Sequence, residues 1–146
     1  MLQVAQLFAT FCCTIFAGAA VYINLVEHPA RMGCATTLAA TVWAPSYKRA
    51  TVMQASLAIL SVLAGVAVWF FGGELLWLAG AVLIGLVVPF TFIVILPTNN
   101  RLLEPGRDLA STETRELLEK WGRLHAVRSG LSLFAASVYL ALLIWK

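Results

Sequence analysis

Long apolar stretches, separated by short polar segments, set the pattern of this chain. Four of them carry almost no charged residue, and each is long enough to cross the roughly 30 Å hydrocarbon core of a bilayer as a helix rising about 1.5 Å per residue. We place the predicted helices near residues 3–27, 51–71, 75–97 and 124–145. The pattern therefore predicts an all-α fold, an integral membrane four-helix bundle in which residues 1–146 form a single membrane-embedded domain.

Prolines and glycines indicate how the helices connect. The turn FGGE at 71–74 makes the second and third spans an antiparallel pair. Pro89 lies inside the third span, and we expect its ring to kink that helix. Pro29 suits the first turn of a helix, and the small apolar residues after it predict a short interfacial helix near 30–42. Because proline disfavours helical geometry in the residue before it, we also expect the chain to bend at His28.

The segment before the fourth span predicts a long last helix. Ser111 or Thr112 can cap a helix start, with Glu113 in the first turn. No helix breaker follows before the fourth span. We therefore expect the fourth span to continue a cytosolic helix, giving one element from about residue 112 to residue 145.

Basic residues fall almost entirely at one end of the predicted bundle. Nine of the ten lie in or beside the loops after the first and third spans, and only Lys146 lies at the other end. By the positive-inside rule, we expect both long loops in the cytoplasm and both termini outside. The membrane we expect is the bacterial inner (plasma) membrane.

The composition supports the membrane class. The chain is 61% hydrophobic and 12% charged, about half the charged fraction of a typical soluble domain. The formal net charge of +3 reflects topology, and we expect no nucleic-acid partner. The first basic residue is Arg31, and the first apolar run exceeds the roughly 7–15 residues of a signal-peptide core. We therefore expect this run to remain as a transmembrane helix.

Small residues at four-residue spacing offer close helix contacts in lipid. They are Ala5, Ala9, Cys13 and Ala17 in the first span, and Ala126 with Gly130 and Ser132 with Ala136 in the fourth. These seams suit either a compact bundle surrounded by membrane lipid or a homo-oligomer, and the sequence does not separate the two uses.

Polar residues gather at the cytoplasmic end of three spans. Such groups are costly in a membrane and usually face a cavity or a partner. They are Tyr22, Asn24, Glu27 and His28 at the end of the first span, Asn100 and Arg101 after the third, and Trp121, His125 and Arg128 on one face of the last. Convergence at one depth predicts a site.

This set of side chains suggests acid–base chemistry. A histidine beside Glu27 would be a general base near neutral pH, and Arg128 with Asn100 would donate hydrogen bonds to a developing oxyanion. The catalytic candidates are His125, Arg128, Glu27, His28 and Asn100. The candidates for substrate binding are Tyr22, Asn24, Trp121 and Arg101.

Cofactor use stays open at this stage. His28, His125 and Glu27 also match a two-histidine, one-carboxylate ligand set for a transition metal. Cofactor-free chemistry is the other alternative. The three cysteines have no metal-binding or redox spacing, and the chain has no phosphate-binding loop and no nucleophile elbow.

The same residues also have a structural interpretation. Arg128 can extend to the polar end of its helix, and Glu27 can pair with Arg31 four residues on. An ion-pair network of Glu27, Arg31 and Arg128 would then hold helices together. The protein would be non-enzymatic: a structural oligomer, or a binder of a small ligand or metal.

Three motifs make the chain resemble the anthrone oxygenase-like family of four-helix membrane proteins. They are VEHPA at 26–30, LPTNNRLL at 96–103 and WGRLHAVRSG at 121–130. The resemblance implies an oxygenase that uses dioxygen on an activated, anthrone-like or quinol-like aromatic carbon. It would suit the candidate site, because a base such as His125 or His28 could remove the acidic methylene proton of an anthrone. Tyr22 and Trp121 would then be stacking walls.

Overall fold

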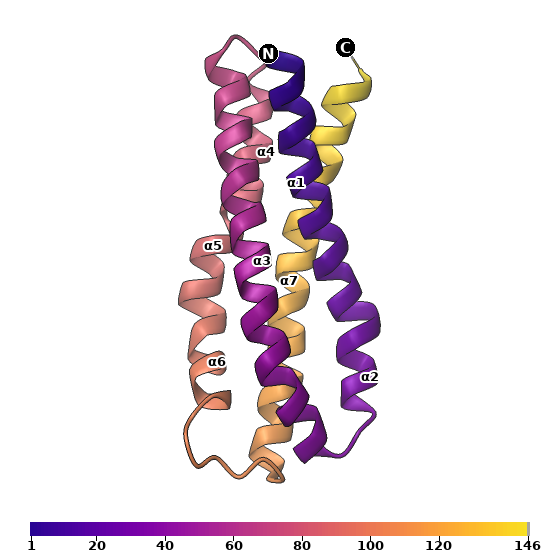
Figure 1. Ribbon diagram of the computed structural model, residues 1–146, viewed down its shortest axis with the longest axis vertical. Coiled ribbons are helices and arrows are strands. Elements are labelled where there is room, and N and C mark those ends of the chain that lie inside the picture. The colour runs from indigo at the N-terminus through magenta and orange to yellow at the C-terminus, as the bar shows by residue number, and fades with distance from the viewer. Residues whose placement is uncertain (146) are drawn as a thin grey trace.

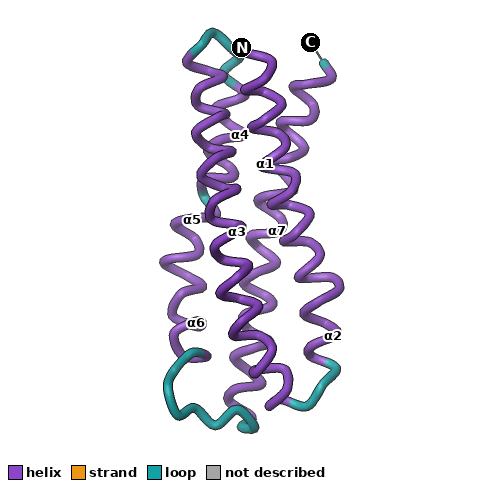
Figure 2. Tube along the Cα trace, in the orientation of Figure 1, coloured by secondary structure: helices purple, strands orange, loops and turns teal. Residues whose placement is uncertain are grey.

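Four antiparallel helical rods form the computed structural model, which describes residues 1–145 (Figure 1). The first rod joins α1 (Leu2–Tyr22), the π-helical turn η1 (Ile23–Glu27) and α2 (His28–Met32), and the second is α3 (Thr36–Phe70). The third joins α4 (Leu76–Gly85), α5 (Val87–Phe90), the π-helical turn η2 (Thr91–Ile95) and α6 (Leu96–Leu102), and the fourth is α7 (Thr112–Ile144). Figure 2 shows loops confined to the rod ends and to the break between α4 and α5.

Each rod is long and apolar enough to cross a bilayer. Large apolar side chains such as Leu63, Phe92 and Ile93 point outward, at 62%, 64% and 74% exposure. Outward apolar surface on this scale suits lipid rather than water. The all-α membrane bundle predicted from the sequence is confirmed, and the protein is an integral membrane protein.

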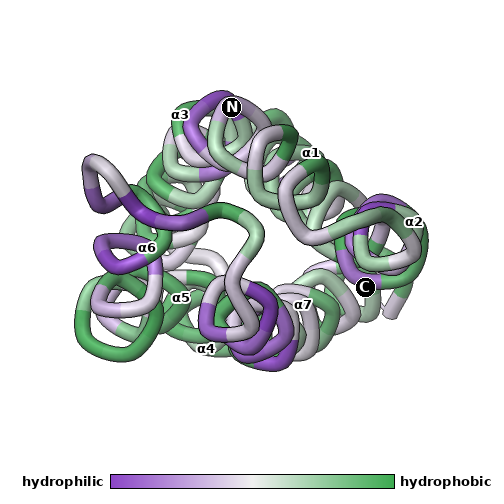
Figure 3. Tube along the Cα trace, turned by 90° about the horizontal axis from the view of Figure 1, so that it is seen from below, coloured by the Kyte–Doolittle hydropathy of each residue, from purple (hydrophilic) through white to green (hydrophobic). Residues whose placement is uncertain are grey.

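The rods surround a common centre. α1 packs against α3 and α7, and α4 packs against the same two helices. Both termini lie at one end in Figure 1, and the loops after α2 and α6 lie at the other. Viewed from that loop end, hydrophilic residues concentrate on the nearest segments (Figure 3). Lys146, the one basic residue counted at the terminal end, lies outside the described residues.

The interfacial helix expected near 30–42 does not form. The first rod continues to Met32, and α3 already begins at Thr36 after a short break. The expected bend at His28 is also absent, because its φ of −66° and ψ of −46° are helical. The reason is the η1 turn, in which the His28 N–H bonds to the Ile23 carbonyl, five residues back. A wider turn leaves room for the Pro29 ring without breaking the helix.

The third rod departs from a regular helix at two places, each shortly before a proline. It breaks at Leu86, three residues before Pro89, where α4 ends and α5 starts. The η2 turn then precedes Pro97 as η1 precedes Pro29, with the Leu96 N–H bonded to the Thr91 carbonyl. A π turn inserts an extra residue, so it rotates every later side chain of α6 relative to a regular helix.

The long last helix is confirmed. α7 starts after Ser111, whose hydroxyl accepts a hydrogen bond from the Thr114 N–H at 3.2 Å. Along α7, an apolar core at Leu117–Trp121 is followed by the buried polar residues His125, Arg128, Ser129 and Ser132 and then by a second apolar core from Ala135. The bundle therefore holds a polar layer between two apolar layers.

Candidate functional site

Asn24 is the centre of a hydrogen-bond network that joins the first rod to α7. Its amide nitrogen donates to the Gly122 carbonyl at 3.1 Å. Its oxygen lies 2.7 Å from His125 Nδ1 and accepts from the Ser129 hydroxyl at 2.5 Å. Gly122 fits here because a methyl group at this position would overlap the His28 ring.

This network fixes the tautomer of His125. The Gly122 carbonyl can only accept, so the Asn24 nitrogen must face it and the Asn24 oxygen must face His125. That oxygen also only accepts, so His125 Nδ1 carries its hydrogen. In the neutral ring Nε2 then holds the free lone pair, and within residues 1–145 it has no hydrogen-bond partner. Nε2 is thus the nitrogen at which the neutral His125 ring could accept a proton.

Arg128 is a buried cation without a carboxylate partner. It is 8% exposed and donates to the Gln54 oxygen at 2.9 Å. Its guanidinium carbon lies 5.6 Å from the centre of the Phe16 ring. Among the described residues no acidic side chain pairs with it. An unpaired charge inside a membrane bundle is costly, so this position favours an anionic ligand.

Arg31, by contrast, is paired. It bonds to Glu27 one turn earlier, and Glu27 also accepts from the Ser46 hydroxyl at 2.6 Å. The pair therefore ties the first rod to α3. The Arg31 side chain is 4% exposed and that of Glu27 is 28% exposed, so the charge of Arg31 faces the bundle interior.

Aromatic rings form one end of the site. Trp121 stacks on His125 with ring centres 4.9 Å apart, and His28 contacts the Trp121 ring at 5.3 Å. Trp43 lies edge-on to Trp121 and stacks on Tyr47. The Tyr47 oxygen accepts from the Asn99 amide at 3.0 Å, which leaves the Tyr47 hydrogen free to donate.

These side chains enclose a small polar cavity. It is lined by Ile23, Arg31, Ser46, Tyr47, Ala50, Thr51, Gln54, Trp121, His125 and Arg128. Its free space is about 10 Å³, roughly enough for one water molecule. Its lining residues carry several buried polar atoms without a partner: Arg31 Nε and Nη1, Gln54 Nε2, Trp121 Nε1 and Arg128 Nε. All of these atoms are donors, so the cavity suits an acceptor-rich or anionic group.

The structure brings together only part of the predicted set. Trp121, His125 and Arg128 line the cavity. Asn24 bonds to His125, and Glu27 bonds to the lining residue Arg31. The other four predicted residues neither line the cavity nor hydrogen-bond through their side chains to a residue that does. They are His28, which lies against Trp121 and Gly122, Tyr22, which is 57% exposed, Asn100, which is exposed, and Arg101, which pairs with Glu113 outside the site.

Asn99 turns inward in place of the predicted Asn100. Asn99 is fully buried, and its amide bonds to Tyr47, which lines the cavity. The sequence interpretation named Arg31 only as an ion-pair partner, and it missed Ser46, Tyr47, Gln54 and Ser129. Gln54 was detectable, since it is a polar residue within an apolar span.

The proposed metal ligands are not assembled. His28 and His125 both contact Trp121, and Glu27 bonds to Arg31 and Ser46. Within residues 1–145, no three His, Cys, Asp or Glu side chains lie close enough to hold a metal ion. The donor-rich cavity instead offers the lone pair of His125 Nε2 as its base.

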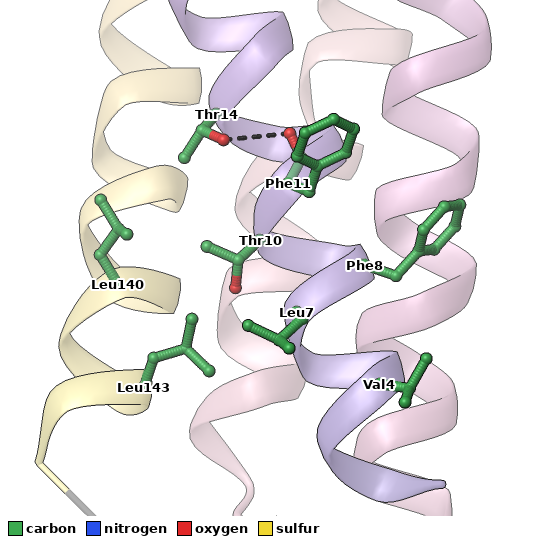
Figure 4. Close-up of a pocket in the computed structure, with 8 residues that line it drawn as sticks. All are labelled: Val4, Leu7, Phe8, Thr10, Phe11, Thr14, Leu140 and Leu143. Atoms are coloured by element: carbon green, nitrogen blue, oxygen red, sulfur yellow. Dashed lines mark hydrogen bonds between the residues drawn. The ribbon is translucent and has the colours of Figure 1, made fainter.

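A larger groove lies near the termini, between α1 and α7 (Figure 4). Its volume is about 470 Å³, and its lining includes Phe8, Phe11 and Leu140. Its two hydroxyl groups, from Thr10 and Thr14, donate to carbonyls of their own helix at 2.9 and 3.0 Å. Nothing in this groove would orient a polar substrate, and it faces the lipid.

Fold and site together define a four-helix membrane protein with a buried, donor-lined cavity. The sequence profile of the anthrone oxygenase family matches residues 43–138. The chain belongs to this family. The matched region contains every cavity residue from α3 and α7, whereas Ile23 and Arg31 precede it.

Two curated relatives are similar over shorter segments. One is the anthrone oxygenase tpcL of Aspergillus fumigatus, 48% identical over 46 residues, which cover 30% of this chain and 29% of the relative. The other is the anthrone oxygenase nsrD of Aspergillus novofumigatus, 47% identical over 53 residues, which cover 34% of this chain and 33% of the relative. The matches thus span about a third of each relative. Both are fungal, so they give the expected bacterial membrane no support. No solved structure matches significantly.

Proposed function

We propose that the protein is a membrane-embedded oxygenase that acts on an anthrone-like or quinol-like aromatic molecule with dioxygen. The observation that carries the proposal is Arg128, a buried cation that has no acidic partner among residues 1–145 and lies beside a cavity lined by unpaired donors. Such a site stabilises a developing oxyanion more than it stabilises a neutral ketone. Family membership supports the same class of reaction.

In this proposal His125 is the general base. Asn24, to which Ser129 also donates, holds its ring, and Nε2 is the nitrogen with the free lone pair. A substrate methylene flanked by aromatic rings and conjugated to a ketone is acidic, and its proton would pass to Nε2. The negative charge then resides mainly on the substrate oxygen, where Arg128 and the Gln54 and Trp121 donors would bind it.

The remaining chemistry belongs to the substrate anion and dioxygen. The anion transfers two electrons to dioxygen and forms a carbon–oxygen bond, and uptake of a proton gives a hydroperoxide. Loss of the second methylene proton with cleavage of the oxygen–oxygen bond releases water and leaves a second carbonyl. One ketone with a methylene and one dioxygen thus give one quinone and one water. No step requires a further reductant.

We also propose that the chain works as one membrane-embedded unit with the loops after α2 and α6 in the cytoplasm. Basic residues at that end support this orientation. Lipid would surround the outward apolar side chains, and the site would lie toward the cytoplasmic side. Two of the predicted small-residue positions, Ala126 and Gly130, are exposed, so they are free to contact a second copy.

The second candidate is a non-enzymatic membrane protein held together by polar contacts. The tie of Arg31 and Glu27 to Ser46 favours it, as do the bonds from Arg115 to the Met32 and Cys34 carbonyls. The network expected for it differs from the observed one, because Arg128 bonds to Gln54 and not to Glu27. The structural candidate leaves the unpaired donors of the cavity without a role.

Conversion of anthrone to anthraquinone by purified protein tests the proposal. His125→Gln should lower turnover by about 10²–10⁴-fold, the usual contribution of a general base. The matched control is His28→Gln, because His28 contacts the same tryptophan but does not line the cavity. A folded His125→Gln protein with full turnover, or no turnover by the wild-type protein, would contradict the proposal.

A further inference from the structure

A second, apolar cleft adjoins the polar cavity. It is about 90 Å³ in volume and lies between α3 and the α5–η2 segment, with Phe16 and Arg128 at its inner side. Its walls include Ala55, Ala58, Val87 and Phe92. Thr51, Gln54 and Arg128 line both spaces. The hydrogen bond between Arg128 and Gln54 therefore forms part of the wall that separates them.

The cleft opens toward the lipid. Phe92 on its rim is 64% exposed and Val88 is 37% exposed, and Ala55 is exposed on the opposite wall. The break at Leu86 contributes, because it separates α5 and α6 from the line of α4, as Figure 1 shows. An apolar molecule dissolved in the bilayer could thus enter sideways between α3 and α5.

We propose that this cleft is the entry and binding site for the flat aromatic part of the substrate, and that the Gln54 side chain separates the cleft from His125 until the substrate enters. The inference rests on the proposed function and adds a route and an orientation. The rings would lie between α3 and α5, with the substrate oxygen against Arg128 and the methylene, on the opposite side of the central ring, facing His125. Rotation of the Gln54 side chain would join the cleft to the polar cavity.

The sizes of the two spaces require this opening. Ligand pockets usually measure about 300 Å³ or more, whereas the cleft and the cavity hold about 90 and 10 Å³. A tricyclic ketone therefore lies partly among lipid chains or widens the gap between α3 and α5. Gln54 can supply the movement at its inner end, because its nitrogen is buried without a partner and only its oxygen is bonded.

Photolabelling with benzophenone, a diaryl ketone, tests the site without depending on turnover. Illumination should label the peptide that contains residues 87–92, and xanthone, a planar ketone with no acidic methylene, should prevent it. Ala55→Trp should fill the mouth of the cleft. The matched control is Ser56→Trp, one residue away, exposed and not part of the lining.

The quantity compared is the protected labelling, the part of the benzophenone labelling that xanthone prevents. It should be equal within a factor of about two in the wild-type protein and in Ser56→Trp. In Ala55→Trp it should fall at least about tenfold, and KM for anthrone should rise by a similar factor. Equal protected labelling in the two tryptophan variants would overturn the inference, as would labelling that xanthone does not reduce. If labelling follows the prediction but no variant oxidises anthrone, the cleft stands and the proposed function fails.

Discussion

The two halves of the bundle use polar side chains in opposite ways. In the half near the termini, Thr10 and Thr14 return their hydroxyl hydrogens to their own helix, which costs little in lipid. In the half near the loops, Asn24 and Arg128 turn inward and bond across helices, and several of their neighbours keep unpaired donors. Both halves are equally helical. Neither secondary structure nor pocket size therefore distinguishes the site from the other half. Its distinguishing feature is a cluster of polar groups left without a protein partner.

After His125→Gln, which removes the base, the largest loss of turnover should come from Asn24→Ala. It removes the acceptor of His125 Nδ1 and Ser129 and the amide that donates to the Gly122 carbonyl. Three broken bonds should destabilise the fold by about 1–3 kcal/mol and turnover should fall about 10²-fold, since the ring loses its orientation. Thermal unfolding and anthrone oxidation measure the two effects.

Thr10→Ala is the matched variant in the other half of the bundle. It removes one buried hydroxyl that bonds within its own helix, so turnover should stay unchanged within about twofold and stability within about 1 kcal/mol. If Thr10→Ala impaired turnover as strongly as Asn24→Ala, the contrast between the two halves would be lost.

The next largest effect, a change in stability, should distinguish two glycine variants on α7. Gly122→Ala would force a methyl group into the His28 ring, whereas a methyl group at Gly130 meets no atom within 4 Å. Gly122→Ala should lower the unfolding free energy by about 1–3 kcal/mol through overpacking. Gly130→Ala should be neutral or stabilise the helix by up to about 1 kcal/mol. Melting temperatures in one detergent compare them, and similar values for both would contradict the packing around His28.

The smallest effect should follow from Tyr139→Phe. Tyr139 stacks on Trp77 in the half near the termini, and its hydroxyl is buried without a partner. In this it differs from Thr10 and Thr14. Removing an unpaired hydroxyl should change stability by less than about 1 kcal/mol, in the stabilising direction, and turnover should not change. A clear loss of turnover in Tyr139→Phe would show that the site extends beyond the polar layer.

The sequence predicted the spans and the long last helix, because these depend on hydropathy and on the absence of helix breakers. It also named three residues that line the cavity, Trp121, His125 and Arg128. Which other side chains face inward was harder to predict. Asn99 is buried where Asn100 is exposed, and the η1 turn keeps His28 helical despite Pro29. A single added residue in a turn leaves no clear mark in the sequence but rotates every later side chain.

The partner of Arg128 was also beyond the sequence. Arg31 bonds to Glu27, as the four-residue spacing indicated, whereas Arg128 bonds to neutral Gln54 and not to Glu27. Gln54 belongs to α3, so the partner of Arg128 depends on how α3 packs against α7, and it leaves Arg128 free to bind an anion.

The most direct test of the account is the absorption spectrum of anthrone bound to the protein without oxygen. If Arg128 and the surrounding donors stabilise the oxyanion, the wild-type protein should hold anthrone as its coloured anion at a pH at which free anthrone remains the neutral ketone. Arg128→Gln should bind anthrone as the neutral ketone only. Neutral anthrone bound to the wild-type protein, or an undiminished anion band in Arg128→Gln, would contradict the account.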